Sequence, residues 1–135
     1  MNLSQILIKS GVTPNHLHPD CKFIAQDGDD GILAEYSKMP LLSKHHKKMW
    51  LIDFMVPNQS LPYIPVISED WQTPLSREQS TADYEEYKKR KYYEIAVKAI
   101  QGIFADKSLS SSEAKEKLEE LVSMIESFID CLDGK

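Results

Sequence analysis

The stretch "FIAQDGDDGILAEY", residues 23–36, decides the fold of the N-terminal half of the chain. Two short runs of alternating side chains flank a centre rich in Asp and Gly, and a period of two is typical of β-strands. Asp and Gly tolerate the positive φ angles that tight turns require. The stretch therefore predicts a β-hairpin over residues 22–36.

The same centre also has the composition of a cation site, because three carboxylates lie close together in sequence, those of Asp27, Asp29 and Asp30. A calcium loop of the EF-hand type needs a Gly at position six and a bidentate Glu at position twelve. Counted from Asp27, these positions hold Ile32 and Lys38. We therefore predict a turn without a metal or cofactor, with weak cation binding as the alternative.

Other segments complete a small N-terminal module. A short helix is expected near the start, where Leu3, Ile6 and Leu7 share one helical face and Gly11 is placed to end it. The apolar run at 48–56 predicts a buried strand. Residues 61–67 contain two prolines, which allow only an edge strand or an extended connector.

The C-terminal half has helical periodicity instead. Two amphipathic helices are predicted at 81–104 and 111–132, and they begin at capping-box patterns, Ser80 with Asp83 and Ser110 with Glu113. The last helix places seven apolar side chains on one stripe: Leu118, Leu121, Val122, Ile125, Phe128, Ile129 and Leu132. A short turn joins the helices, which should form an antiparallel hairpin.

The fold class expected from these elements is α+β, with a small antiparallel sheet followed by an αα-hairpin. Two parts are predicted, a small α+β module at 1–75 and a helical hairpin at 76–135, packed on that module or extending from it. At 135 residues the chain is long enough to bury a core of its own.

The composition limits the classes of function. The net charge of −5 disfavours a general DNA-coating role, because affinity for phosphates depends on concentrated Lys and Arg. No apolar run approaches the roughly 20 residues of a membrane helix, and the first residues lack the basic region of a signal peptide. We expect a cytoplasmic protein, not bound to membranes, whose Cys21 and Cys131 are reduced thiols, although the sequence alone leaves a disulfide open.

Two basic patches are candidate partner-binding sites. The first consists of Lys44, Lys47 and Lys48, followed by Trp50, and the second consists of Lys88, Lys89, Arg90 and Lys91, with Tyr84 and Tyr87 nearby. Nucleic-acid modules combine such charges with stacking aromatic rings. The alternative is a solvated surface, in which Glu85 and Glu86 neutralise bases one helical turn away. Nucleic-acid binding through the two patches is therefore a second hypothesis.

Metal and catalytic sites have weaker support. The stretch "HLHPDC", residues 16–21, offers zinc ligands but no familiar spacing of further ones. Asp53 lies in an apolar run and would form an acid–base pair only if His45 or His46 approached it. No hydrolase, phosphate-loop or metalloprotease motif is present. The sequence thus favours a binding protein without catalytic residues, and a small hydrolase or metal-dependent enzyme is the third hypothesis.

One segment resembles small proteins of tailed phages and prophages. Those proteins carry I-A-x-D, then D-G, a Tyr, K-x-P and a downstream Trp, and the matching residues here are Ile24, Ala25, Asp27, Asp30, Gly31, Tyr36, Lys38, Pro40 and Trp50. The match covers about 30 residues, with one additional residue after Asp27 and an insertion, "LLSKHH", before the Trp. The resemblance implies a β-hairpin module and a phage or prophage origin, and it implies no activity.

These observations favour a small accessory protein that acts by binding another macromolecule. In the phage context that the resemblance implies, the partner would be a host protein, and the chain would inhibit or modulate a defence or nucleic-acid-processing function. The C-terminal helices also offer a surface for a homodimer, since the spacing of their apolar residues suits helix packing.

Overall fold

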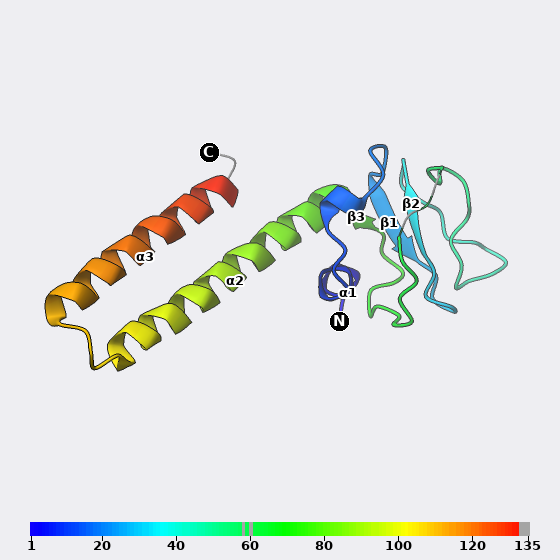
Figure 1. The fold of residues 1–135 in the computed structure, drawn as a ribbon. Coiled ribbons are helices and arrows are strands. Elements are labelled where there is room, and N and C mark those ends of the chain that lie inside the picture. The colour runs from blue at the N-terminus through cyan, green and yellow to red at the C-terminus, as the bar shows by residue number, and fades with distance from the viewer. Residues whose placement is uncertain (58, 60, 133–135) are drawn as a thin grey trace. The chain divides into compact units, whose positions relative to one another are not determined.

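The computed structural model describes residues 1–57, 59 and 61–132. The chain divides into two compact units, Met1–Tyr84 and Glu85–Lys135. Helix α2 (Arg77–Ala105) contributes residues to both units. The chain has the predicted α+β class, with a sheet in the first unit and a helical hairpin in the second (Figure 1).

Helix α1 (Leu3–Lys9) confirms the short helix predicted near the start, and it begins at a capping box. The Asn2 side chain accepts a hydrogen bond from the Gln5 backbone N–H, and the Gln5 side chain accepts one from the Asn2 N–H. The helix ends before Gly11, whose φ of 79° is accessible to Gly at little cost. A single 3-10 turn, Pro14–His16, follows it.

The sheet has three antiparallel strands in the order β2-β1-β3. Strands β1 (Phe23–Gln26) and β2 (Leu33–Tyr36) form the predicted hairpin, with Ala25 opposite Ala34. Strand β3 (Leu75–Ser76) pairs with the other edge of β1. This third strand was missed in the sequence, because two residues beside a proline carry no periodic signal.

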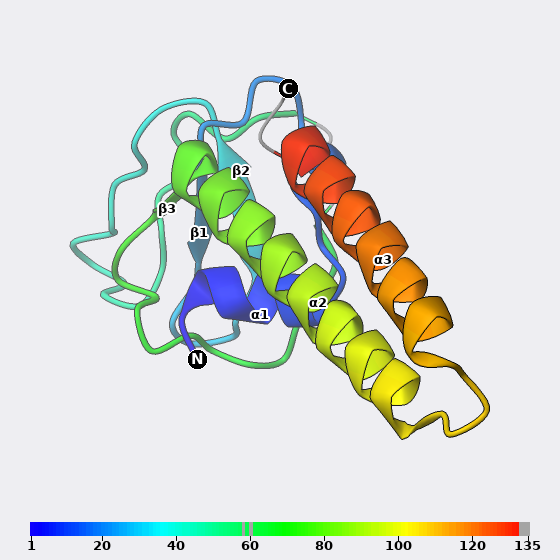
Figure 2. The same ribbon diagram turned by 90° about the vertical axis from the view of Figure 1, so that its left-hand side faces the viewer.

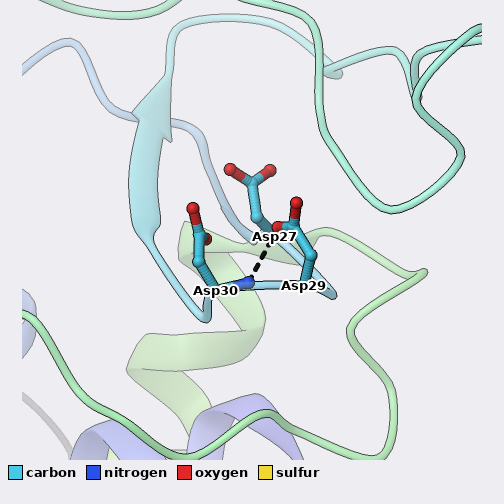
Figure 3. Close-up of side chains that lie close together, drawn as sticks. All are labelled: Asp27, Asp29 and Asp30. Atoms are coloured by element: carbon cyan, nitrogen blue, oxygen red, sulfur yellow. Dashed lines mark hydrogen bonds between the residues drawn. The ribbon is translucent and has the colours of Figure 1, made fainter.

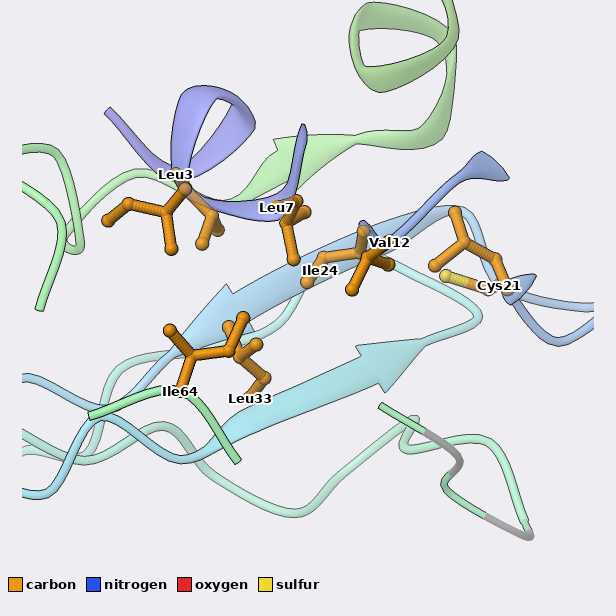
Figure 4. Close-up of a cluster of buried hydrophobic side chains, with 9 residues drawn as sticks. Leu3, Leu7, Val12, Cys21, Ile24, Leu33 and Ile64 are labelled. Carbon is orange, nitrogen blue, oxygen red and sulfur yellow. The ribbon is translucent and has the colours of Figure 1, made fainter. Parts of the chain in front are cut away.

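Both faces of the hairpin are covered. On one face Ile24 and Leu33 pack with residues from α1 and the segments beside it, in a cluster of Leu3, Ile6, Leu7, Val12, Leu17, Cys21, Ile24, Leu33 and Ile64 (Figure 4). On the other face Ala25, Ala34 and Tyr36 pack with Trp50. A sheet of three short strands is therefore buried between a helix and a loop.

The predicted strand at 48–56 was wrong. This run makes only isolated bridges, Leu42 with Trp50 and Tyr36 with Met55. It is interrupted at Phe54, whose φ of 67° is incompatible with a strand. The backbone N–H of Glu35 in β2 donates to the Gln59 side chain at 2.7 Å, and its C=O accepts from the Gln59 side chain at 3.1 Å and from the Val56 N–H at 3.0 Å.

The edge strand predicted at 61–67 was also wrong, and the alternative of a connector holds. Pro62 and Pro65 lack the N–H groups that a ladder needs. Ile64 is nevertheless buried in the core. The segment is held by the Gln26 side chain, whose Nε2 donates to the Val66 carbonyl and whose Oε1 accepts from the Ser68 N–H.

The two C-terminal helices are confirmed, with one shifted boundary. Helix α2 begins at Arg77, four residues before the predicted start, because Ser76 accepts the hydrogen bond from the Gln79 N–H and acts as the cap. Helix α3 (Ser111–Leu132) has the predicted bounds, and Ser110 caps it by accepting from the Glu113 N–H. The helices run antiparallel, side by side (Figure 2).

Only a narrow seam of the helical hairpin is buried. Among the described side chains of this unit, Ala96 of α2 and Leu121 of α3 are the buried apolar ones, and the Tyr92 and Phe128 rings stack at 4.8 Å between centroids. Val122 and Phe128, which the sequence placed on the packed stripe, are exposed. The side chain of Leu132, also on that stripe, lies outside the described part.

The remaining expectations concern membranes and thiols. Within the described part of the chain, no helix combines the length and apolar character needed to cross a bilayer. Both cysteines are free thiols, Cys21 buried and Cys131 exposed. Burial chiefly, together with the negative charge of Glu35, raises the pKa of the Cys21 thiol to about 11. Cys21 is thus an apolar core residue at neutral pH.

Replacement of Gly28 by Ala tests the packing of the hairpin turn. A Cβ at this position would lie 2.5 Å from the Trp71 indole, so we expect Gly28→Ala to destabilise the fold by about 1–3 kcal/mol. Urea unfolding measures the change. Gly102→Ala is the control, because its Cβ meets nothing and a helical Ala should be neutral or stabilising. If Gly28→Ala costs as much in a Trp71→Ala background as in the wild type, the proposed clash is refuted.

Candidate functional site

The candidate site is the segment that covers one face of the hairpin, residues 38–55, which we name the basic–apolar loop. Residues 42–50 fold back on themselves, since Leu42 and Trp50 form a bridge and Leu51 donates to the Leu41 carbonyl at 2.8 Å. The tip is closed by a hydrogen bond from the His46 N–H to Ser43 Oγ. The loop thus has a defined shape without being part of the sheet.

Trp50 anchors the loop to the end of β1. Its indole N–H donates to the Gln26 carbonyl and its backbone N–H donates to Asp27 Oδ1, both at 2.8 Å. The Gly28 N–H donates to the Lys48 carbonyl at 2.7 Å. Trp50 is buried, so its ring is not available for stacking on a nucleic-acid base, which was one of the two roles that its position suggested.

The outer side of the loop combines positive charge with apolar side chains. Its exposed large apolar residues are Met39, Leu41, Met49, Leu51, Ile52, Phe54 and Met55, and Ile52 is 80% exposed. The loop carries four lysines against one acid, Asp53, in a chain of net charge −5. Large apolar side chains gathered on a surface mark sites of interaction.

The lysines predicted as partner-binding residues lie at the tip of this loop. Lys44, Lys47 and Lys48 are exposed, and none of them forms an ion pair with another described residue. The apolar residues beside them were not predicted, because the run at 48–56 was interpreted as a buried strand. The interruption of that run by Asp53 was the available signal, since a fully buried strand rarely contains an unpaired acid.

Phe54 is held in an unfavourable backbone conformation. It is the one described non-glycine residue with positive φ, at 67°. Its carbonyl accepts hydrogen bonds from the N–H and the hydroxyl of Ser37, at 2.8 and 3.2 Å, and these contacts fix the conformation. Lys38 Nζ lies 5.3 Å from the centre of the Phe54 ring, within the range of a cation–π contact. Strained backbone of this kind is concentrated at functional sites.

The acidic turn at residues 27–30 has a structural role. Asp29 accepts a hydrogen bond from the Asp30 N–H (Figure 3). Asp30 accepts one from the Ile32 N–H. Asp27 holds Trp50, as described above. One possible ligand oxygen from each of the three carboxylates lies within 4.8 Å of the others, and all three have these backbone partners. The hydrogen bonds account for the aspartates without a cation.

The surroundings of Asp27 disfavour the charged form of its carboxyl group. Desolvation raises the pKa of its carboxyl above the ordinary value, and the negative charges of Asp30 and Asp29 raise it further. The hydrogen bond from the Trp50 N–H opposes this shift. The ionised form of Asp27 is therefore disfavoured by folding, although an oxygen acceptor at this position is needed.

Glu35 is fully buried, unlike the half-buried Asp27. Its Oε1 accepts a hydrogen bond from the His18 N–H at 2.8 Å, and its Oε2 has no hydrogen-bond partner among the described residues. The Arg77 guanidinium donates nearby, to the His18 and Cys21 carbonyls. These contacts fix the segment that leads into β1, and they leave Arg77 engaged with backbone carbonyls.

The second predicted basic patch is largely neutralised. Lys88 pairs with Glu85 at 3.0 Å, Arg90 with Glu86 at 3.3 Å and Lys91 with Glu94 at 3.5 Å. Lys91 also lies over the Tyr87 ring, while Lys89 and Tyr84 are half-buried. The interpretation of this patch as a solvated, internally paired helix surface is favoured by these contacts.

The metal and catalytic candidates are not brought together. His16 Nδ1 accepts from the Thr13 N–H, His18 Nδ1 accepts from the Asp20 N–H, and Cys21 is buried. Within the described ranges, only the three aspartates of the turn bring three possible ligand atoms close together. Asp53 is exposed and lies in a turn, not in a strand.

One hollow opens elsewhere on the first unit. It has a volume of about 530 Å³ and is lined by Lys22, Phe23, Ser76, Arg77, Glu78 and Thr81. Its lining holds a single carboxylate and no histidine, so it lacks the carboxylate–histidine or paired-carboxylate arrangement that commonly serves acid–base catalysis. The basic–apolar loop is therefore the stronger candidate site.

Comparison with known proteins supplies no relative: no family model, curated protein or solved structure matches the chain.

Two substitutions of Asp27 separate its roles. Asp27→Asn keeps an oxygen acceptor for Trp50 and removes a disfavoured charge, so we expect equal or higher stability than wild type at neutral pH. Because the folded-state pKa is raised, the wild-type penalty is present above that pKa and disappears as the pH falls below the ordinary carboxyl value. Asp27→Ala removes the acceptor and should cost about 1–3 kcal/mol. Urea unfolding at neutral pH and at a pH below the ordinary carboxyl pKa measures each effect. A strongly destabilised Asp27→Asn at neutral pH would contradict this account.

Proposed function

We propose that the protein is a small accessory protein without catalytic activity, which acts by docking on another protein through the basic–apolar loop. The observation that carries this proposal is the exposure of Ile52 and Phe54 on a loop of fixed conformation that also carries four lysines. Binding energy at protein interfaces is concentrated in a few such apolar anchors. A preformed loop also loses little conformational entropy on binding.

The charge of the loop specifies the partner's chemistry. Four lysines and one acid favour a partner with an acidic surface around an apolar depression. Rim charges of this kind accelerate association and set salt dependence, while the apolar anchors determine how long the complex lasts. The proposed partner is therefore an acidic protein that binds even at high salt.

The phage or prophage origin gives the partner its biological setting. The resemblance suggests a host protein as the target, and inhibition or modulation of a host defence or nucleic-acid-processing function as the outcome. The cytoplasm of a bacterial host is then the place of action. The C-terminal helices would make the protein self-associating and so present the loop twice to a target.

Nucleic-acid binding is the second candidate. The exposed lysines at 44–48 favour it, whereas the burial of Trp50 and the ion pairs of residues 88–91 disfavour it. The two candidates differ in their response to salt, because phosphate contacts weaken steeply as salt rises.

A pull-down from nuclease-treated bacterial lysate tests the proposed function. We expect a host protein to be retained at high salt by the wild type, and to be bound at least about tenfold more weakly by Ile52→Ser and Phe54→Gly. Phe54→Gly tests binding separately from stability. Gly accommodates the φ of 67°, so the fold should be as stable as wild type or more so.

Tyr63→Ser is the matched control, since Tyr63 is an exposed apolar residue of the same unit outside the loop. Retention that is equally reduced by Tyr63→Ser, or unaffected by the loop variants, would exclude the loop as the binding site. Recovery of nucleic acid from an untreated lysate, released by modest salt and lost on combined Lys44→Ser, Lys47→Ser and Lys48→Ser substitution, would instead establish the second candidate.

A further inference from the structure

A second apolar surface lies on the helical hairpin, away from its buried seam. On α2 the residues Tyr93, Val97, Ile100 and Phe104 are spaced by four, three and four, so they form one row along the helix. Val97 is 52% exposed and Phe104 is 72% exposed. On α3 the corresponding row is Leu118, Val122, Ile125 and Ile129, of which Val122 is 50% exposed.

The two rows lie on the same side of the hairpin. Val97 directly follows Ala96, and Val122 directly follows Leu121, where Ala96 and Leu121 are the buried residues of the seam. One residue further along a right-handed helix turns the side chain by about 100°. Because the helices run in opposite directions, these equal rotations bring both valines to the same side. We name this surface, defined by Tyr93, Val97, Phe104 and Val122, the hairpin face.

We infer that the hairpin face binds a second copy of the chain and that the two hairpins form an antiparallel four-helix bundle. This inference gives the proposed self-association a defined surface, and it does not depend on the identity of the loop's partner. In the bundle, α2 of one copy lies against α3 of the other, related by a twofold axis along the hairpin.

The size of the face is sufficient for a dimer. Helix α3 has 22 residues and is therefore about 33 Å long, and two packed helices are about 20 Å wide. The face thus covers on the order of 600 Å² per copy, and a pair of copies buries about 1,200 Å², the lower end of specific stable interfaces.

Charge selects a second copy as the occupant. Residues 85–105 of α2 carry five bases against three acids, whereas α3 carries two bases against six acids. The net charges of the two helices are thus +2 and −4, and these opposite signs favour a twofold axis that places α2 of one copy against α3 of the other. The alternative, with α3 against α3, would bring the two acidic helices together.

The register of the hairpin predicts one specific contact. The stacked rings place Tyr92 level with Phe128, and counting five residues toward the turn on each helix places Val97 level with residue 123. Val122 is one residue from this level, about 1.5 Å along the helix, so the twofold axis sets Val97 of one copy close to Val122 of the other. A charge at position 97 should weaken the dimer, and an opposite charge at position 122 should restore it.

Sedimentation equilibrium of the full chain tests the inference. We expect twice the monomer mass for the wild type at micromolar concentration, and a dimer dissociation constant raised at least about tenfold by Val97→Glu. The double variant Val97→Glu/Val122→Lys should recover the dimer. Ile95→Glu is the matched control, because Ile95 is an equally exposed apolar residue of α2 outside the hairpin face. Circular dichroism confirms that each variant remains helical.

A monomeric wild type would overturn the inference, and so would equal losses from Val97→Glu and Ile95→Glu. Failure of the double variant to recover the dimer would refute the arrangement of α2 against α3. These outcomes are independent of the loop, because Ile52→Ser should remain dimeric whether or not it binds a host protein.

Discussion

The first unit depends on the side chains at the end of strand β1. Gln26 is fully buried, and its amide hydrogen-bonds to the Gly31 and Val66 carbonyls and to the Ser68 N–H. The next residue, Asp27, accepts from the Trp50 N–H. Every buried backbone N–H and C=O needs a hydrogen-bond partner. Three short strands offer too few partners for the long segments that pass over them. Two adjacent side chains therefore take the place of further strands, and the loops that they hold can display apolar residues that a strand would have buried.

Local signals explain which parts of the fold could be predicted. The hairpin followed from alternation around an Asp-Gly centre, α1 from the shared face of Leu3, Ile6 and Leu7, and α3 from the capping pattern at Ser110 and Glu113. The segment at 48–56 could not be predicted, because its hydrophobicity is the same for a strand and for an anchored loop. The loop is determined by contacts between Trp50 and residues more than 20 positions earlier in the chain. A local sequence pattern cannot predict such long-range contacts.

The candidate site was predictable in part for the same reason. The lysines at 44–48 were visible as a charge cluster, but the exposure of Ile52 and Phe54 depends on the left-handed backbone at Phe54. In the helical unit, periodicity predicted the apolar stripe of α3, of which Leu121 is buried and Val122 and Phe128 are exposed, whereas the exposed row on α2 was not predicted. Periodicity could not show that one hairpin buries only the seam around Ala96 and Leu121. The spacing of an apolar stripe is the same whether or not a single partner helix can cover its full width. Both proposed surfaces thus arise where apolar sequence exceeds what the chain itself can bury.

Hydrogen exchange of backbone amides, measured by NMR, tests the central claim most directly. If side chains replace strands, the amide of Trp50, bonded to Asp27, and that of Ser68, bonded to Gln26, should be protected like those of β1. The amides at the exposed tip around Lys47 should exchange rapidly. Protection of Trp50 that is lost in Asp27→Ala and kept in Asp27→Asn would establish the anchor. Exchange at Trp50 and Ser68 as fast as at the tip would show that the loops are not held, and the account of a preformed binding loop would then be wrong.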